Sequence, residues 1–225
     1  MKLSIIVPVL DEAPLVADAL RRLRGIAGDA EILVVDGGSS DGTARLAGAC
    51  GRVLQSERGR ARQLNLGAQE ARGEWLLFLH VDTRLPPEFR QAIAEAESTG
   101  CAAGVFRLRI VGRHPLLPLL GLGANLRTRL RRIFLGDQAL FIRKALFREL
   151  GGFPDLPLLE DYAFSLLLKR RGLPCYLSPL RVETSGRRWD TRGFFSTWWL
   201  FRRIFHRYRM SGGSAQALGQ YEQIR

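Results

Sequence analysis

The chain of 225 residues has few cysteines and almost no lysine. Its three cysteines, Cys50, Cys101 and Cys175, are far apart and form no CxxC pair. This pattern excludes the usual zinc-ribbon spacing and a disulfide framework, and it is typical of proteins from a reducing compartment. Of the 34 basic residues only 3 are lysine, so arginine supplies nearly all of the positive charge.

Long hydrophobic runs are absent as well. No stretch approaches the ~20 apolar residues that span a membrane. The N-terminal stretch MKLSIIVPVLDEA is apolar only over a short length and is broken by Pro8 and by Asp11-Glu12. It therefore does not resemble a signal peptide, and we expect a cytoplasmic protein.

Both common glycine-rich phosphate loops are missing. The turn after the first apolar run reads PVLDEAP and contains no glycine, which excludes the G-x-G-x-x-G motif of dinucleotide-binding folds there. The Walker motif GxxxxGK[ST] is not found either. If the protein binds phosphate at this turn, the remaining route is a divalent metal held by carboxylates.

The charge is unevenly distributed along the chain. Residues 1–100 carry 12 basic and 14 acidic side chains, whereas residues 101–225 carry 22 basic and 8 acidic ones. A basic half indicates an anionic partner, which could be a nucleic acid, a membrane surface or a phosphorylated ligand. An arginine-rich proteome would produce the same excess without any such partner.

Short apolar runs alternate with helical patterns in the first half. Runs of strand length occupy Leu3–Val9, Glu31–Val35, Arg52–Gln55 and Trp75–His80, and helical patterns occupy 14–25, 43–49, 60–71 and 86–98. The second half is less regular, with strands expected at 103–111, 139–142 and 175–182 and helices within 114–132, 160–171 and 194–209. This alternation predicts an α/β protein with a mostly parallel sheet that is covered by helices on both faces.

Acidic residues follow three of the predicted strands. They are Asp11-Glu12, Asp36 and Asp82. Because parallel strands end at one edge of a sheet, we expect these carboxylates to lie together where ligands bind. Asp82 is the candidate metal ligand, and His80 would lie on the same side of the strand because side chains alternate with a period of two. Turn formation or helix capping explains any single acid, and Asp41 in particular.

Three stretches in order, SIIVPVLDEA, EILVVDGGSSDGT and WLLFLHVDT, resemble the motifs of family 2 glycosyltransferases. Later segments (ERGRARQLNLGA, LGDQALF, GGFPD, LEDYAFSLLLKRRG and SGRRW) resemble a small bacterial branch of that family. The resemblance implies the GT-A fold, a mostly parallel Rossmann-like sheet flanked by helices, with a C-terminal amphipathic helical segment. It places a glycosyltransferase domain at 1–190, with a nucleotide-binding half at about 1–100 and an acceptor half at about 101–190, followed by a helical segment at 191–225.

The resemblance also implies roles for single residues. It assigns the nucleotide pocket to Val9, Asp11, Glu12 and Asp36, with Asp36 on the uracil or ribose. It gives Asp82 to Mn²⁺ or Mg²⁺ bridging the diphosphate, and it makes Asp161, beside Glu160, the general base. The sequence departs from the family at His80, where relatives usually have Asp; in many of them this residue contacts the ribose more than the metal.

The chemistry of sugar transfer fits these roles. A departing diphosphate needs its negative charge neutralised, by a dication and by arginines. Arg58, Arg60 and Arg62 are candidates, and Arg62 is preferred here. The acceptor hydroxyl loses a proton as it attacks, which a carboxylate at a helix N-terminus such as Asp161 can accept. Direct attack opposite the leaving group inverts the anomeric centre. Further candidates for contacts with the acceptor or diphosphate are Asp137, Gln138, Arg187, Arg188 and Trp189; the last three resemble an arginine-tryptophan motif of processive family members.

An apolar stripe near the C-terminus could contact a membrane. Its members, Phe194, Trp198, Phe201, Phe205 and Tyr208, recur at helical spacing and are flanked by arginines. PLLPLLGLG at residues 115–123, followed by several arginines, could form a second contact. The alternative is that both segments pack on the sheet. The membrane interpretation predicts a lipid-linked or lipid-like acceptor, such as an isoprenoid, a carotenoid or a glycerolipid headgroup, and a protein peripheral to the inner membrane face.

Two other functions remain open at this point. A nucleotidyltransferase uses a related sheet and metal-binding carboxylates, but it normally needs a glycine-rich loop with a basic residue after the first strand. A non-catalytic basic protein that binds membrane or nucleic acid would explain the charge of the second half, but the strand-end carboxylates would repel phosphate. We therefore predict a metal-dependent, inverting glycosyltransferase that uses a nucleotide-diphosphate sugar, foremost a UDP-sugar, and we expect no nucleic-acid partner.

Overall fold

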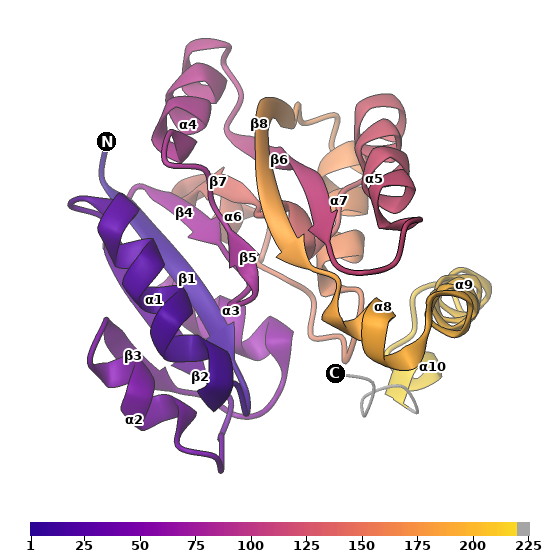
Figure 1. Ribbon diagram of the computed structural model, residues 1–225. Helices are drawn as coiled ribbons and strands as arrows, with labels where there is room; N and C mark the ends of the chain where they lie inside the picture. Colours follow the sequence, from indigo (N-terminus) through magenta and orange to yellow (C-terminus); the bar gives the residue numbers. More distant parts are fainter. Residues whose placement is uncertain (220–225) are drawn as a thin grey trace.

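The structure is a computed structural model that describes residues 1–219. Its sheet has the strand order β3-β2-β1-β4-β7-β6-β8-β5 (Figure 1). The strands are β1 (Leu3–Val9), β2 (Glu31–Asp36), β3 (Arg52–Gln55), β4 (Trp75–Phe78), β5 (Thr83–Arg84), β6 (Ala103–Val111), β7 (Phe141–Arg143) and β8 (Tyr176–Ser185). The α-helices are α1 (Ala13–Ala27), α2 (Thr43–Gly48), α3 (Arg60–Glu70), α4 (Phe89–Ser98), α5 (Leu117–Arg131), α6 (Lys144–Glu149), α7 (Glu160–Arg170), α8 (Arg187–Arg192), α9 (Phe194–Met210) and α10 (Gln216–Gly219).

The first half of the sheet is parallel throughout. β3, β2, β1 and β4 pair in this order, so the carboxyl ends of β1, β2 and β4 meet at one edge. In the second half, β7 is antiparallel to both β4 and β6, β8 is parallel to β6, and β5 is antiparallel to β8. The predicted α/β sheet is confirmed, and the antiparallel strands are confined to the region after β4.

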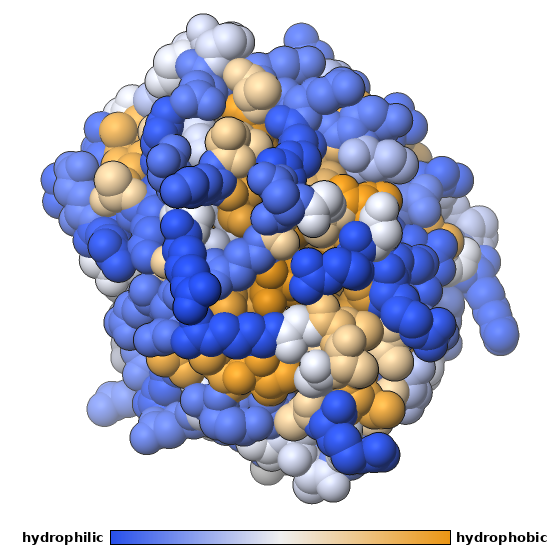
Figure 2. All heavy atoms as spheres, turned by 90° about the vertical axis from the view of Figure 1, so that its left-hand side faces the viewer, coloured by the Kyte–Doolittle hydropathy of each residue, from blue (hydrophilic) through white to orange (hydrophobic). Residues whose placement is uncertain are grey.

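Helices cover both faces of the sheet, which is why the central strands are apolar on both sides. Val16 and Leu20 of α1 and Phe89 of α4 belong to the core on one face. On the other face the core contains Leu64 of α3 and Phe164 of α7. Figure 2 views the molecule from the α1 side, where polar side chains surround apolar atoms in a central hollow.

The fourth strand is shorter than the predicted Trp75–His80. The ladder ends at Phe78, and the N–H of Thr83 donates to the carbonyl of His80 (3.0 Å), which closes a turn over residues 80–83. The expectation that His80 and Asp82 share one face of a strand is therefore wrong. The chain reverses here to form the two-residue strand β5 against β8, a pairing more than 90 residues distant in sequence.

The apolar stripe of α9 lies against protein. Ile204, Phe205 and Tyr208 belong to a small core with Tyr162 of α7, whose ring centroid is 5.1 Å from that of Phe205. Phe205 and Tyr208 therefore pack on α7, while Phe194 and Phe201 pack on Trp189 of α8. No helix within residues 1–219 combines the length and the apolar character needed to cross a membrane, and residues 220–225 of the predicted C-terminal segment lie outside the described residues.

Candidate active site

The turn after β2 is organised by Asp36, which is buried. Its Oδ2 accepts the N–H groups of Gly38 (3.1 Å) and Ser39 (3.0 Å), and its Oδ1 accepts the hydroxyl of Ser39. A carboxylate has about four acceptor positions, so these donors leave room for roughly one more. The geometry makes Asp36 a structural residue of the turn that can still accept one hydrogen bond from a ligand.

The loop after β1 is tied to the same turn. Asp11 has a positive φ of 51°, its N–H donates to Ser39 Oγ (2.9 Å), and its Oδ1 accepts the N–H of Ser40 (2.8 Å). Asp41 accepts the N–H of Ala13 at the start of α1 (2.9 Å) and bonds to Thr43, whose hydroxyl lowers the pKa of the Asp41 carboxyl. This geometry agrees with the role in turn formation or helix capping that the sequence suggested for Asp41.

Gln63 holds the ends of β1 and β2 together. The side chain is buried in α3, and its Nε2 donates to the carbonyls of Val9 and Val35, both at 2.8 Å. The carbonyl of Val9 also accepts the N–H of Gly37 (3.0 Å), and the Val9 side chain is buried. Val9 therefore contributes its main-chain carbonyl, and not its side chain, to this edge of the sheet. Nothing in the local sequence pattern points to Gln63.

Two of the strand-end carboxylates converge on one guanidinium. Arg187 forms two hydrogen bonds with Glu12, at 3.0 Å through Nη1 and 2.5 Å through Nη2. Its Nε lies 3.9 Å from Oδ2 of Asp82. The expected meeting of acids from the ends of β1 and β4 is therefore found, with the positive charge of Arg187 between them.

The carboxyl of Asp82 is partly buried and lies near a guanidinium and a second carboxylate. Burial raises the pKa of its carboxyl above the usual value, Arg187 opposes this effect, and Glu12 adds to it. Within the described part of the chain no group of three or more His, Cys, Asp or Glu side chains could hold a metal by itself. Mn²⁺ or Mg²⁺ bound by one or two carboxylates needs the oxygens of a bound phosphate to complete its shell, so Asp82 and Glu12 fit a metal that arrives with a diphosphate.

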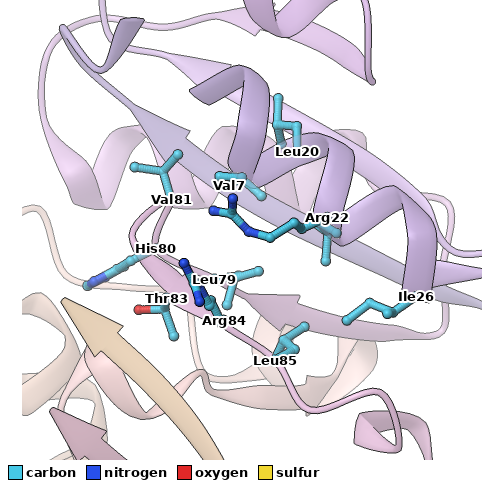
Figure 3. A pocket seen from close by; sticks show the side chains of 12 residues that line it. Val7, Leu20, Arg22, Ile26, Leu79, His80, Val81, Thr83, Arg84 and Leu85 are labelled. Atoms are coloured by element: carbon cyan, nitrogen blue, oxygen red, sulfur yellow. The ribbon is translucent and has the colours of Figure 1, made fainter. Parts of the chain in front are cut away.

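His80 lies close to the predicted base. A Cβ placed on Gly136 would be 2.8 Å from Oδ2 of Asp161 and 3.0 Å from Nε2 of His80, so both side chains approach the same backbone. A cavity of about 10 Å³ beneath them is lined by His80, Glu160 and Asp161, among others. It has room for one water molecule at most. A larger pocket lies behind this segment, between α1 and residues 79–85, and Figure 3 shows the His80 ring turned away from the guanidinium groups of Arg22 and Arg84 there.

The two acids at the start of α7 have different surroundings. Glu160 is fully buried and forms an ion pair with Nε of Arg60, whereas the Asp161 side chain keeps 10% of its exposure. Oδ2 of Asp161 accepts the N–H of Gly136 (2.5 Å), and Nη2 of Arg60 lies 3.6 Å from it. Burial raises the pKa of Asp161; Arg60 opposes this shift and Glu160 adds to it. A reachable carboxylate with a raised pKa suits a general base.

Arg60, rather than the preferred Arg62, faces the carboxylates. Burial alone would lower the pKa of Arg60, but attraction by Glu160 and Asp161 outweighs it and raises this pKa. Arg62 is half exposed and pairs with Glu57 (2.7 Å) and Asp155 (3.0 Å). Spacing along the helix could not separate the two arginines, because the partners of Arg60 are 100 residues away in sequence.

The GDQ segment, residues 136–138, adds a further acid that is partly buried. Burial raises the pKa of Asp137 to about 6, although Arg127 opposes the shift, and its Oδ1 has no hydrogen-bond partner among the described residues. Gln138 is buried; its Oε1 accepts the hydroxyl of Thr128 (2.9 Å) and its Nε2 donates to the carbonyl of Phe106 (3.1 Å). Asp137 thus lies in the charge network of the site, while the amide of Gln138 is engaged with β6 and α5.

The remaining candidates lie on α8. Arg188 lies close enough to Arg60 and Asp82 to interact with them, and burial, with repulsion by Arg60, lowers its pKa. The ring of Trp189 packs 5.4 Å from that of Phe194 and 5.8 Å from that of Phe201. Arg187 and Arg188 therefore face the carboxylates, and Trp189 joins α8 to α9.

Acids and arginines that converge at the carboxyl ends of parallel strands are typical of α/β proteins that bind phosphorylated ligands there. The comparisons with known proteins narrow this class. The model of glycosyl transferase family 2 matches residues 4–147, and the chain belongs to this family. Sugar transfer is the reaction that the description of this family names.

Solved structures of the same fold are distant in sequence. TarS from S. aureus, residues 1–349, matches with a TM-score of 0.67 and 20% identity over 84% of this chain and 61% of that one. It has also been solved in complex with UDP. The mannosyltransferase PcManGT from Pyrobaculum calidifontis, in complex with GDP-Man and Mn²⁺, matches with a TM-score of 0.66 and 23% identity over 99% of this chain and 68% of that one. The chain thus spans about three fifths of the TarS structure, and no curated protein sequence matches it.

Proposed function

We propose that the protein transfers a sugar from a UDP-sugar to an acceptor hydroxyl with inversion at the anomeric carbon. The single observation that carries this proposal is the placement of Asp82 and Asp161. Burial raises the pKa of each carboxyl, each lies within 4 Å of an arginine nitrogen, and both belong to the edge where β1, β2 and β4 end. The UDP complex of TarS supports the choice of uridine.

The nucleotide lies against the ends of β1 and β2 in this proposal. Asp36 uses its remaining acceptor position for the base or ribose, and the main chain of Val9, with Asp11 and Glu12, forms the wall of the pocket. His80 contacts the ribose or the sugar, beside Gly136. Arg62 pairs with two acids at the protein surface and contacts the donor only if these pairs open.

Asp82 holds the divalent metal, with Glu12 near it. When bound, Mn²⁺ or Mg²⁺ supplies positive charge to the diphosphate as it leaves. The Mn²⁺ in the PcManGT complex supports manganese in particular. Arg187 and Arg188 donate hydrogen bonds to the same phosphates, because a guanidinium fits phosphate oxygens in two-point contacts.

Asp161 accepts the proton of the acceptor hydroxyl. Direct attack on the face opposite the diphosphate forms the new glycosidic bond and breaks the old one in a single displacement, which inverts the centre. Glu160 stays buried with Arg60 and fixes the start of α7, so it positions Asp161. Asp137 and the backbone of Gln138 border the acceptor side.

The acceptor is lipid-linked or lipid-like, and the enzyme works at the cytoplasmic face of a membrane without spanning it. The strongly basic second half supports this location. Residues 1–190 form the catalytic domain, and α9 packs against α7 and stabilises it. A nucleotidyltransferase and a nucleic-acid-binding protein are less well supported, because the family match accounts for the carboxylates.

Thermal unfolding with a panel of donors tests the proposal. UDP and UDP-sugars together with Mn²⁺ should raise the melting temperature, and GDP, CDP or nucleotides without metal should raise it less. Transfer or slow hydrolysis of the matching nucleotide sugar should accompany the shift. The choice of uridine is wrong if GDP-sugars give the larger shift, and the proposed reaction is wrong if no nucleotide sugar is consumed.

A further inference from the structure

Helix α5 presents an apolar ridge to solvent. The ridge consists of four leucines that are 56–70% exposed: Leu119, Leu122, Leu126 and Leu130. Their spacing of three, four and four residues places them on one side of the helix. The other side is buried, with Leu117, Gly121, Ala124 and Thr128. An isolated exposed leucine needs no explanation, but four in a row along one helix face do.

The contacts of α5 with β6 fix the ridge in this outward position. The side chain of Asn125 accepts the N–H of Leu108 (2.7 Å) and donates to its carbonyl (3.0 Å). A Cβ on Gly121 would lie 3.2 Å from the carbonyl of Leu108, so the helix runs close against the strand. Rotation of the ridge toward the sheet would break these contacts. Figure 1 places α5 beside β6, on the side of the molecule opposite α1.

The charge around the ridge has one sign. Residues 101–136 contain seven arginines and no acidic residue. Arg129, Arg131 and Arg132 are exposed at the end of α5, and no ion pair within residues 1–219 involves them. Clusters of exposed guanidinium groups beside an apolar ridge are the composition of helices that lie in a lipid headgroup layer.

A groove of about 770 Å³ runs beside the ridge, between α5 and β6. Arg107, Arg113 and Arg129 contribute to its lining, together with Leu122 and Leu126 of the ridge. The groove therefore combines guanidinium groups with apolar side chains. Phosphate-bearing lipids have this combination of an anionic head and apolar chains.

We propose that α5 is the membrane-docking surface of this protein, and that its partner is a bilayer with anionic lipids. The leucine ridge enters the boundary between headgroups and acyl chains, and the arginines contact lipid phosphates. This inference rests on the proposed function only in that docking would bring the enzyme to a lipid-like acceptor. A second copy of the chain fits the surface less well, because symmetric contact through α5 would bring arginines against arginines.

Vesicle flotation tests this directly, with the full chain and no nucleotide. The protein should float with vesicles of phosphatidylcholine and phosphatidylglycerol and remain unbound with phosphatidylcholine alone. Leu122→Ser with Leu126→Ser should lower the partition coefficient by about tenfold or more for each leucine, because each lost side chain forfeits its transfer into the apolar layer. Met210→Ser, at another highly exposed apolar residue, is the control and should bind like the wild type.

Two double variants with the same change in net charge test whether binding depends on the arginines of α5 or only on the total charge. Arg129→Gln with Arg131→Gln should weaken binding, and added salt should weaken it further. Arg22→Gln with Arg45→Gln, on α1 and α2, makes the same change in net charge and should leave most of the binding intact. Equal losses in the two double variants would overturn the assignment to α5.

Other outcomes are equally decisive. Wild-type protein that ignores anionic vesicles overturns the docking surface. If it instead forms a dimer that Leu122→Ser with Leu126→Ser dissolves, the ridge is an interface between copies. Saturable binding of an acidic protein at the ridge, without vesicle binding, identifies a protein partner instead. The thermal shift with UDP and Mn²⁺ is measured without lipid, so the docking surface and the proposed reaction fail or hold independently.

Discussion

The acids in the loops after β1 and β2 (the first half of the site) and those at residues 137–161 (the second half) are held in different ways. In the first half, Asp11, Asp36 and Asp41 accept backbone N–H groups and hydroxyls from neighbouring turns. In the second half, Glu160 and Asp161 are balanced by Arg60, and Asp137 by Arg127. Hydrogen bonds from the backbone hold the acids around the donor, whereas burial beside arginines raises the pKa values of Asp161 and Asp137. The first arrangement suits binding and the second suits proton transfer.

The largest expected effect is at the base. Asp161→Asn should lower kcat by about 10²–10⁴-fold, because an amide accepts no proton, while the affinity for UDP and Mn²⁺ is retained. Asp155→Asn, at an exposed acid that pairs with Arg62, is the matched control and should keep its activity. Steady-state kinetics with the donor found in the screen measures both. A normal kcat for Asp161→Asn would contradict the role of Asp161 as the general base.

Next in size is the difference between two arginines of α3. Arg60→Gln leaves Glu160 buried and unpaired, which should cost about 3–5 kcal/mol of unfolding free energy. Arg62→Gln removes two exposed ion pairs and should change stability little. Urea denaturation of both variants gives the comparison. Equal losses would mean that Arg60 does not neutralise the buried acid.

The raised pKa of Asp137 should make the free energy of unfolding depend on pH. Its pKa is raised from 3.8 to about 6, so between these values the folded state keeps a proton that the unfolded chain loses. Stability should therefore fall as the pH rises through this window, by at most about 3 kcal/mol. Asp137→Asn should be more stable than the wild type near neutral pH and lose this advantage near pH ~4. Asp82 and Asp161 have raised pKa values too and remain in the variant, so the difference between the two proteins is the measurement. A difference independent of pH would contradict the raised pKa of Asp137.

The smallest effect belongs to the donor pocket. Gln63→Met removes two buried hydrogen bonds to Val9 and Val35 and should cost about 1–3 kcal/mol. Gln69→Met, at an exposed position on the same helix, should cost nothing measurable. Denaturant titration compares the two. A neutral Gln63→Met would show that β1 and β2 hold their ends without the amide.

Local patterns were sufficient for the parallel half of the fold. β1 and β3 agree with the predicted bounds, and α9 begins at the predicted Phe194. The two-residue β5 could not be predicted, because only its pairing with β8 defines it. Likewise, the acids at the strand ends were visible in the sequence, but the roles of Arg60 and Gln63 depend on partners 100 and 54 residues away.

The sequence also did not show which apolar helix faces are covered by other elements, as α9 illustrates. Its stripe was correctly identified as one helical face, but periodicity does not say what covers that face. Phe205 and Tyr208 pack against the cluster of Tyr162 and Ile133, whereas Phe195 and Trp199 on another side of α9 and the leucines of α5 remain exposed. Amphipathic patterns therefore predicted the helices, while the fold decided which apolar face remains in contact with solvent.

The central claim is that a dication at Asp82 neutralises the diphosphate of the donor. Anomalous diffraction from crystals grown with Mn²⁺ and UDP tests it most directly. The account predicts a manganese peak within bonding distance of Asp82 and of the diphosphate oxygens, with Arg187 moved from its position between Glu12 and Asp82. Bound UDP with no metal peak at Asp82, or a peak at other side chains, would contradict it.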